Sequence, residues 1–209
     1  MLIAEEEVIL ALKANNIEIK GVLHIGAHEC EESGFYNRLG VNPDNVIWIE
    51  GNKTKVEQAK KRNIKTMYYG VISEKDSQIV EFNITNNGQS SSILHLGSHA
   101  QHHPDVHFVE KQFHSTITVD TFYKRNNLDM SQYDFWNFDI QGAELKALKG
   151  AKKSIEYAKA IYLEVNIEEV YKECALMEEI DNYLAQYKFK RIITNITQFG
   201  WGDALYIKS

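Results

Sequence analysis

Short apolar segments rich in β-branched and aromatic residues alternate with polar segments of helical length along most of this chain. Buried strands of a parallel sheet appear in sequence as continuous apolar runs of this kind. The predicted strands are VLHIGA (22–27), VIWIE (46–50), TMYYGVI (66–72), YDFWNFDI (133–140) and AIYLEVN (160–166). Because right-handed crossovers place helices on both faces of a parallel sheet, the alternation predicts an α/β fold.

The remaining segments complete this outline. The first 20 residues predict a leading helix, centred on 4–14, from the helical spacing of their apolar residues. Further helices are predicted at 31–40, 52–63, 121–127, 143–155 and 170–187. QIVEFNIT (78–85) alternates as a half-buried strand with Ile79 and Phe82 inward, and STITVD (115–120) predicts another strand. FKRIITNIT (189–197) and GDALYIK (202–208) flank a tight polar segment and predict a closing antiparallel hairpin.

Composition limits the partners and the location. A length of 209 residues with two prolines and no linker-like tract predicts a single domain, 1–209. The net charge of -6 gives no basic field for nucleic acid. Cys30 and Cys174 are too few for a disulfide framework and are expected to be free thiols. The acidic, amphipathic N-terminus and the absence of a long apolar run predict neither a signal peptide nor a membrane span, hence a cytoplasmic location.

The ends of the first two predicted strands are the first candidate site. Ligands of open α/β sheets bind beyond the carboxyl ends of the strands. Gly26 ends the first strand and permits close approach of a ligand, and the acidic Glu50, followed by Gly51, ends the second. An acid there typically accepts hydrogen bonds from ribose hydroxyls. The loop after Gly26 is rich in carboxylates and lacks the further glycines of a dinucleotide fingerprint, so it favours a cofactor with a sulfonium and an ammonium group.

The segment FDIQGAELKALKGA (138–151) is the second candidate site. Asp139 and Gln141 are expected at the carboxyl end of a central strand, and Glu144 in the first turn of the next helix. A carboxylate in a first turn is stabilised by the helix dipole, so Glu144 has either a capping or a catalytic role. A buried aspartate without a partner is costly, which indicates ligand, metal or proton-transfer chemistry at Asp139.

A polar, histidine-rich stretch from Asn86 to His114 has no clear periodicity and predicts a long loop that acts as a lid or binding segment. His95 and His99 have the spacing of a metal pair on one helix face, but nothing else nearby resembles a metal motif. The favoured interpretation is a polar lid, with no metal. Ser90 to Ser92 either line an acceptor pocket or form an ordinary turn.

These segments together resemble the FkbM-type methyltransferase family. The resemblance covers roughly residue 20 to the end and rests on HIGAHECEE, VIWIEGN, the SSSIL segment, FDIQGAELKALKGA, IYLEVN and WGDALYIK. It implies a Rossmann-like class I methyltransferase fold: a mostly parallel seven-stranded sheet with helices on both faces and a C-terminal antiparallel hairpin. It also implies transfer of the methyl group of S-adenosylmethionine to an oxygen, on a sugar or other small-molecule or glycan hydroxyl.

The expected chemistry and the resemblance together give roles to individual residues. An alcohol acceptor must lose its proton, and Asp139 is the first candidate for the general base, with His28 and the loop histidines behind it. The cofactor set is His24, Gly26, Ala27, His28, Glu50, Gly51, Ile72, Asp139 and Gln141. The acceptor set is Ser91, Ser92, His99, Glu144 and Glu164. His24 stands where many relatives have an acid and Cys30 where a second glycine is usual, so Glu29, Glu31 or Asp139 would organise the methionine end of the cofactor.

Two alternatives remain from the sequence. One is a non-catalytic protein of the same fold that binds a nucleoside or a glycan. The other is a nicotinamide-dependent oxidoreductase, which the missing glycine fingerprint disfavours. Formation of S-adenosylhomocysteine in the presence of an acceptor would separate the enzyme from the binding protein. The acceptor and the oligomeric state are not encoded in any pattern found here.

Overall fold

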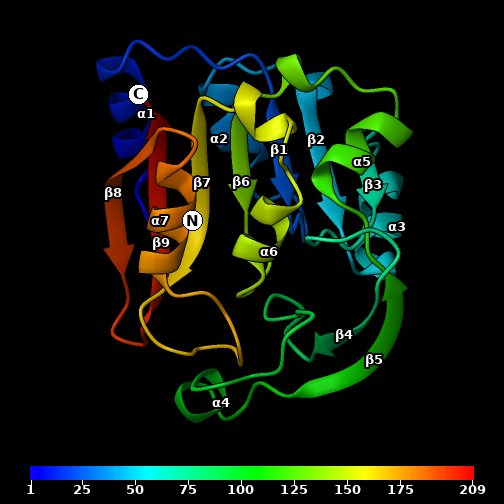
Figure 1. Ribbon diagram of the computed structural model, residues 1–209. Helices are drawn as coiled ribbons and strands as arrows, with labels where there is room; N and C mark the ends of the chain where they lie inside the picture. Colours follow the sequence, from blue (N-terminus) through cyan, green and yellow to red (C-terminus); the bar gives the residue numbers. More distant parts are fainter.

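A computed structural model describes all residues, 1–209, and contains one seven-stranded sheet and one two-stranded sheet. The large sheet has the order β3-β2-β1-β6-β7-β9-β8 (Figure 1). Its strands are β1 (Val22–Ile25), β2 (Val46–Glu50), β3 (Met67–Tyr69), β6 (Phe135–Phe138), β7 (Ala160–Asn166), β8 (Phe189–Ile196) and β9 (Trp201–Lys208). All neighbours pair in parallel except β7–β9 and β8–β9, which are antiparallel. The predicted mostly parallel sheet with a C-terminal hairpin is therefore confirmed.

Helices cover both faces of this sheet. Those with at least six residues are α1 (Glu5–Ala14), α2 (Ser33–Arg38), α3 (Lys53–Lys61), α5 (Val119–Arg125), α6 (Glu144–Lys149) and α7 (Met177–Ala185). The first three contribute apolar side chains to one core layer and the last three to the other (Figure 1). None of these helices combines the length and the apolar character needed to cross a membrane.

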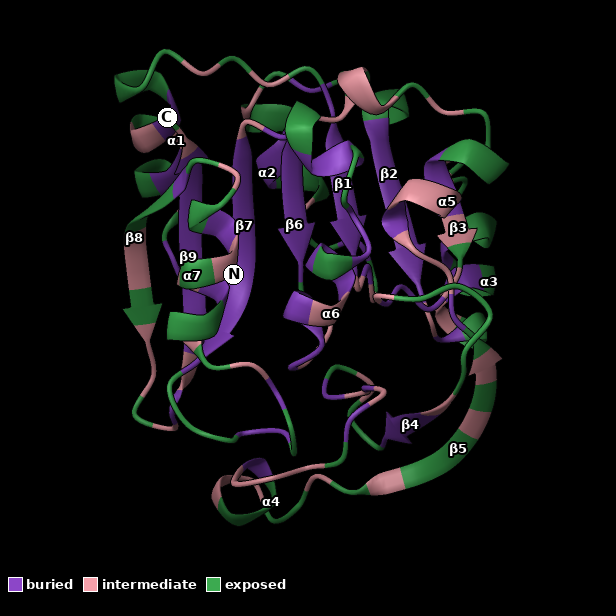
Figure 2. Cartoon of the chain, viewed as in Figure 1, coloured by how far each residue is buried: buried purple, intermediate pink, exposed green.

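The alternation of side chains within each strand creates the two core layers. In β1, Leu23 and Ile25 pack against the layer of α5, α6 and α7, whereas Val22 packs against the layer of α1, α2 and α3. Successive side chains of a strand point to opposite faces, so both faces of a central strand need apolar residues. β1, β2, β6 and β7 are buried along their whole length (Figure 2). This explains why these four segments are the most recognisable strands in the sequence.

The segment after β3 differs from the prediction. β4 (Ile79–Thr85) pairs antiparallel with β5 (Phe108–Ser115) in a separate two-stranded arm. The predicted loop 86–114 thus contains most of a strand, together with the short helix α4 (His99–His102). Phe82 is buried as predicted, but Ile79 is 66% exposed. Residues three apart in a strand point to opposite faces, so Ile79 and Phe82 could not both point inward.

Three further boundaries are wrong in the prediction. Only Ser115 of the predicted strand 115–120 is in a strand, and Val119 begins α5. The helix predicted at 143–155 ends at Lys149 and is followed by a separate 3-10 turn, Ser154–Tyr157. The helix predicted at 170–187 begins only at Met177, where the Glu179 carboxylate accepts a hydrogen bond from the Leu176 N–H at 2.9 Å. The loop before it holds Tyr171 in position near the carboxyl ends of the strands.

The carboxyl ends of β1, β2, β6 and β7 lie along one edge of the large sheet. In Figure 1 these ends point toward the lower part of the molecule, where α4 and the β4–β5 arm lie. The polar segment that precedes α4 connects this arm to the edge. The edge is therefore bounded by strand ends on one side and by the histidine-rich segment on the other.

Candidate active site

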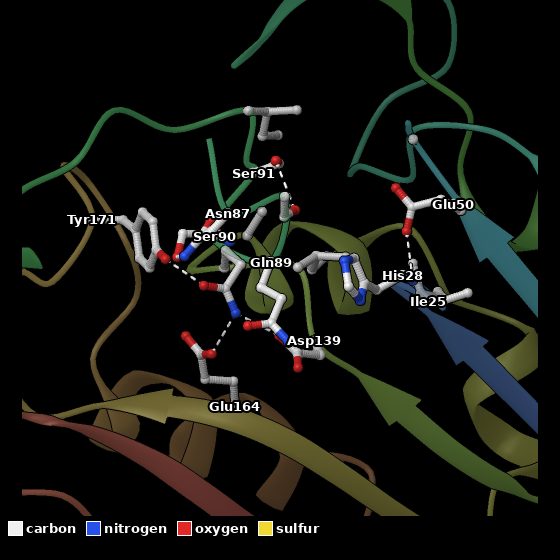
Figure 3. Close-up of a pocket in the computed structure, with 18 of the residues that line it drawn as sticks. Ile25, His28, Glu50, Asn87, Gln89, Ser90, Ser91, Asp139, Glu164 and Tyr171 are labelled. Carbon is white, nitrogen blue, oxygen red and sulfur yellow. Dashed lines mark hydrogen bonds between the residues drawn. The ribbon is translucent and has the colours of Figure 1, made fainter. Parts of the chain in front are cut away.

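A cavity of about 480 Å³ lies at this edge. Its walls are formed by the residues that follow β1, β2, β3 and β6, by the end of β7, the start of β9 and the segment after β4. The predicted site residues that line it are Gly26, Ala27, His28, Glu50, Gly51, Ile72, Ser91, His99, Asp139, Gln141 and Glu164. Figure 3 shows the side chains that converge on this space from the strand ends and from the segment after β4. The fold thus brings together residues separated by up to 138 positions in the chain, from Gly26 to Glu164.

The loop after β1 passes tightly between its neighbours. Gly26 has a φ of +90°, and a Cβ placed on it would lie 1.7 Å from the backbone oxygen of Asp139. The N–H groups of Gly26 and Ala27 both donate to the carbonyl of Ile49, at 2.9 and 3.1 Å. Only glycine satisfies both the left-handed φ and this close approach. The loop is therefore held at the cavity by the backbones of both adjacent strands.

Glu50 fastens the same loop to the end of β2. One carboxylate oxygen accepts a hydrogen bond from the His28 N–H at 2.8 Å, and the other accepts one from the Asn52 N–H at 2.7 Å. The side chain is buried, and this burial raises the pKa of Glu50 although the two N–H groups favour its charged form. Each oxygen keeps a lone pair that a ligand hydroxyl can use.

His28 forms a short dyad with Glu31. Its Nδ1 lies 2.7 Å from a carboxylate oxygen of Glu31, while its Nε2 is buried and has no hydrogen-bond partner. The residue has a φ of +39°, an uncommon conformation for a side chain other than glycine. His28 lines the cavity through its other atoms, while its Nε2 is covered by neighbouring atoms.

Gln141 connects the ends of β6 and β7. Its amide nitrogen donates to Asp139 at 2.5 Å and to Glu164 at 2.7 Å, and its amide oxygen accepts a hydrogen bond from the Tyr171 hydroxyl (Figure 3). The amide of Gln141 therefore lies between two carboxylates and donates one N–H group to each. Gln141 adopts a left-handed φ of +56°, which directs its side chain into this position.

Asp139 differs from the expectation of a buried aspartate. Its side chain is solvent-exposed at the cavity, although protein atoms surround the group on the other sides. The loss of solvent around the carboxylate raises the pKa of Asp139 to about 6, and the negative charge of Asp203 is the second cause of this rise. A carboxylate that is accessible and titrates near neutral pH is suited to accept a proton from a bound ligand.

Three predicted site residues do not line the cavity. His24 lies on the α2 side of β1, where its ring packs 4.8 Å from that of Trp48 and its Nδ1 lies 2.7 Å from the Tyr36 hydroxyl. Burial lowers the pKa of His24 to about 3, so the imidazole is neutral. Side-chain alternation in β1 places His24 on the face of the sheet opposite Leu23 and Ile25. The sequence shows that His24 is in a strand, but it does not show toward which face of the sheet the side chain points.

Glu144 and Ser92 instead stabilise the backbone near the cavity. One oxygen of Glu144 accepts hydrogen bonds from the N–H groups of Ile140 and Gly142, at 2.9 and 3.2 Å. Ser92 donates to the Gln141 carbonyl at 2.8 Å and accepts from the Leu94 N–H at 3.0 Å. Both side chains are almost completely buried. The capping interpretation of Glu144 is therefore the one that the geometry supports.

The histidines of the segment before β5 do not form a metal site. α4 begins at His99, so His95 is not on the same helix, and it packs instead near Phe108. No group of three His, Cys, Asp or Glu side chains has the arrangement of a metal site. His99 is buried, and its Nδ1 has no hydrogen-bond partner.

Several cavity residues were not predicted from the sequence. Tyr171 comes from a segment predicted to be helical, and Trp201 and Asp203 come from the C-terminal hairpin. Asp203 is the register partner of Glu164 across the antiparallel β7–β9 pair. In the sequence, the only feature that marks Asp203 is that it is an acidic residue near the start of an apolar strand. Its place in the cavity wall becomes evident only from the pairing of β9 with β7.

Comparison with known proteins identifies the family. A family model described as the methyltransferase FkbM domain matches residues 23–191. No curated protein matches the chain. An O-methyltransferase from Bacillus cereus, in complex with S-adenosylhomocysteine, has a similar structure, with a TM-score of 0.51 and 11% identity over 98% of this chain and 80% of that one.

Two further solved structures are similar at lower TM-scores. Magnesium protoporphyrin IX methyltransferase from Synechocystis PCC 6803 has a TM-score of 0.48 and 13% identity, over 98% of this chain and 78% of that one. An O-methyltransferase from Streptomyces achromogenes has a TM-score of 0.49 and 11% identity, over 98% and 79%. At such identities the similarity concerns the fold.

Proposed function

This chain belongs to the FkbM methyltransferase family, and we propose that it transfers the methyl group of S-adenosylmethionine to a hydroxyl oxygen of a sugar or other small-molecule acceptor. One observation carries the proposal. A single cavity extends from the loop after β1 and Glu50 to Asp139 and Glu164. The residues proposed to hold the nucleoside and a group that can accept a proton therefore line the same cavity.

The end of the cavity near β1 and β2 suits the cofactor. Gly26 leaves room for close approach, Glu50 presents free lone pairs toward ribose hydroxyls, and Ile72 and Val71 supply apolar surface for an adenine ring. The carboxylates around the cavity favour a ligand with a sulfonium and an ammonium group. When bound, S-adenosylmethionine supplies an electrophilic methyl group.

Asp139 has the chemistry of the base in this proposal. A hydroxyl oxygen that gains a methyl group must lose its proton, and a positioned carboxylate can take that proton. Gln141 holds Asp139 by a hydrogen bond and limits its rotation. His28, whose Nε2 is free and whose Nδ1 is paired with Glu31, is the second candidate. Most of the remaining rate enhancement comes from holding the acceptor oxygen in line with the transferred methyl group.

Two measurements test the proposal. Calorimetry with S-adenosylhomocysteine should give saturable binding at one site, whereas NAD should not bind. S-adenosylmethionine labelled in its methyl group should then transfer label to hydroxyl compounds in a panel of sugars. Binding without any transfer across a broad panel would favour the non-catalytic alternative. Absence of S-adenosylhomocysteine binding would overturn the proposal.

A further inference from the structure

The acceptor end of the cavity contains an unusual pair of facing acids. Glu164 in β7 and Asp203 in β9 are direct register partners on adjacent antiparallel strands. Side chains at such positions lie about 5 Å apart at Cβ, and like charges directly opposite each other are destabilising. Glu164 is 6% exposed and Asp203 is 7% exposed, so water screens their repulsion poorly. Both side chains line the cavity, so a cation bound there would offset their repulsion.

Each of the two carboxylates retains one oxygen without a partner. Glu164 uses one oxygen to accept a hydrogen bond from Gln141, and its other oxygen has no partner in the fold (Figure 3). Asp203 accepts hydrogen bonds from the Tyr162 hydroxyl and the Leu2 N–H on a single oxygen, and its second oxygen is likewise free. Both residues line the cavity, and neither free oxygen is among the fully buried atoms without a partner. The two free oxygens are therefore accessible from the cavity and can accept hydrogen bonds from a ligand there.

The charged side chains that line the cavity all have one sign, and the amino group of Met1 is the one cation at its wall. Its carboxylates are Glu31, Glu32, Glu50, Asp139, Glu164 and Asp203, and no lysine or arginine lines it. The amino group of Met1 is near enough to oppose the rise in the pKa of Asp139 and Glu32, but it makes no hydrogen bond to Glu164 or Asp203. A bound S-adenosylmethionine near β1 and β2 would leave Glu164 and Asp203, at β7 and β9, without a counter-charge.

Aromatic side chains complete the same end of the cavity. Trp201 lies two residues before Asp203 on the same face of β9 and packs against the apolar cluster that contains Tyr171. The ring of the buried His99, whose Nδ1 has no partner, lies 5.5 Å from the ring of Tyr171. The faces of aromatic rings attract cations. Carboxylates combined with aromatic walls are a common environment for an ammonium group.

From these contacts we infer that Glu164 and Asp203, with Trp201 and Tyr171 beside them, form a subsite for a positively charged amino group of the acceptor. The inference rests on the proposed function, because it treats this end of the cavity as the acceptor side. The acceptor class is then an amine-bearing hydroxyl compound such as an amino sugar. Phosphorylated and carboxylate-bearing acceptors are disfavoured, because six carboxylates and no lysine or arginine line the cavity.

The test measures binding to protein saturated with S-adenosylhomocysteine. The probes are three matched sets, each with a free amine, its N-acetyl derivative and a carboxylate: glucosamine, N-acetylglucosamine and glucuronate; the corresponding galactose compounds; and ethanolamine, N-acetylethanolamine and glycolate. We expect the amine to bind most tightly in at least one set and the carboxylate to bind least tightly. Glu164→Gln should reduce that amine's affinity about 10- to 100-fold through loss of a charge-assisted hydrogen bond.

Matched variants separate the possible causes. Glu57→Gln removes one negative charge from an exposed position on α3 and should leave amine binding unchanged. Asp203→Asn should act like Glu164→Gln. The inference is wrong if no set favours its amine, or if both variants weaken S-adenosylhomocysteine and spare the amine. If S-adenosylhomocysteine itself does not bind to the unmodified protein, the proposed function fails instead.

Discussion

At the scale of single residues, the site depends on carboxylates whose surroundings give them different tasks. Glu50 is buried and bound to two backbone N–H groups, whereas Asp139 is accessible at the cavity and bound to one amide. Glu144 is fully enclosed and serves the backbone. The three residues have the same functional group, and their different partners suit them to the proposed roles of cofactor contact for Glu50 and base for Asp139, and to backbone support for Glu144.

Replacing Asp139 by asparagine should abolish most of the activity. Loss of a positioned base typically costs about 10²- to 10⁴-fold in kcat. Because the pKa of Asp139 is raised to about 6, the wild-type rate should rise as the pH increases through this value and the carboxylate loses its proton. The pH profile of kcat/KM should lose this limb in Asp139→Asn, measured at saturating S-adenosylmethionine so that a change in cofactor affinity does not affect the rate. A variant that keeps both its rate and its pH dependence would assign the base to another group, and His28→Ala would then be the variant to compare.

Replacing Glu50 by alanine should weaken cofactor binding. The change removes charge-assisted hydrogen bonds to the ribose and the anchor of the His28 backbone, together worth about 1–3 kcal/mol of binding free energy. The dissociation constant for S-adenosylhomocysteine should rise accordingly in calorimetry, and Glu57→Ala on the exposed face of α3 should not change it. Equal affinities for wild type and Glu50→Ala would show that Glu50 has no contact with the cofactor.

At the scale of elements, the turns that follow the strands carry the site. The turn between β6 and α6 contains Gln141 and Gly142, both with positive φ, and Glu144 accepts the hydrogen bonds of its backbone. This turn directs the Gln141 amide between Asp139 and Glu164. Short βα turns are rigid only if such backbone groups are satisfied, so the capping residue supports the site from outside the cavity.

Replacing Gly142 by alanine should destabilise this turn. Gly142 has a φ of +94°, and a Cβ would lie 2.9 Å from the Cys174 Cβ and 3.0 Å from the Tyr171 Cβ. We expect the free energy of unfolding, measured in urea, to fall by about 1–3 kcal/mol. Gly34 provides the control, because it lies in α2 with no atom within 4 Å of the added Cβ. Gly34→Ala should leave the stability equal or raise it by up to about 1 kcal/mol. Equal effects of the two changes would contradict this account.

At the scale of the whole molecule, one edge of the sheet concentrates negative charge. Enclosure by the protein raises the pKa of Glu144 to about 8 and that of Glu164 well above its usual range. These groups bind protons more tightly in the folded than in the unfolded chain. Their contribution to stability is therefore complete below pH 4.5, the ordinary value for glutamate, and is lost as the pH rises toward 8.

The free energy of unfolding should consequently decrease between about pH 4.5 and 8, by up to about 1.4 kcal/mol per pH unit for each such group. Glu144→Gln keeps an oxygen that can accept the N–H groups of Ile140 and Gly142 but has no proton to lose. Urea titrations across this range should show a shallower decrease for Glu144→Gln than for wild type. A stability that increases with pH over the same range, or an identical slope in the variant, would contradict the prediction.

The alternation of strands and helices was readable from the sequence because burial on both faces imposes apolar runs on β1, β2, β6 and β7. Gly26, Glu50 and Asp139 were found for a related reason: the residues that follow such runs must lie at one edge of a parallel sheet. β4 was predicted at 78–85, but β5 was not, because β5 is exposed or half-buried along its length and exposed strands carry a weak pattern. His24 does not line the cavity because strand alternation turns its side chain toward α2.

The local pattern of side chains by itself determined the fold class, the family resemblance and the strand ends where the cavity lies. The tertiary structure alone decided that Glu164 faces Asp203, that Gln141 connects Asp139 to Glu164, and that Tyr171 and Trp201 line the same cavity. Periodicity in the sequence shows which face of its own helix or strand each residue occupies. The contacts named above are made between different elements, so they depend on strand order and register. Those are set by packing between segments far apart in the chain.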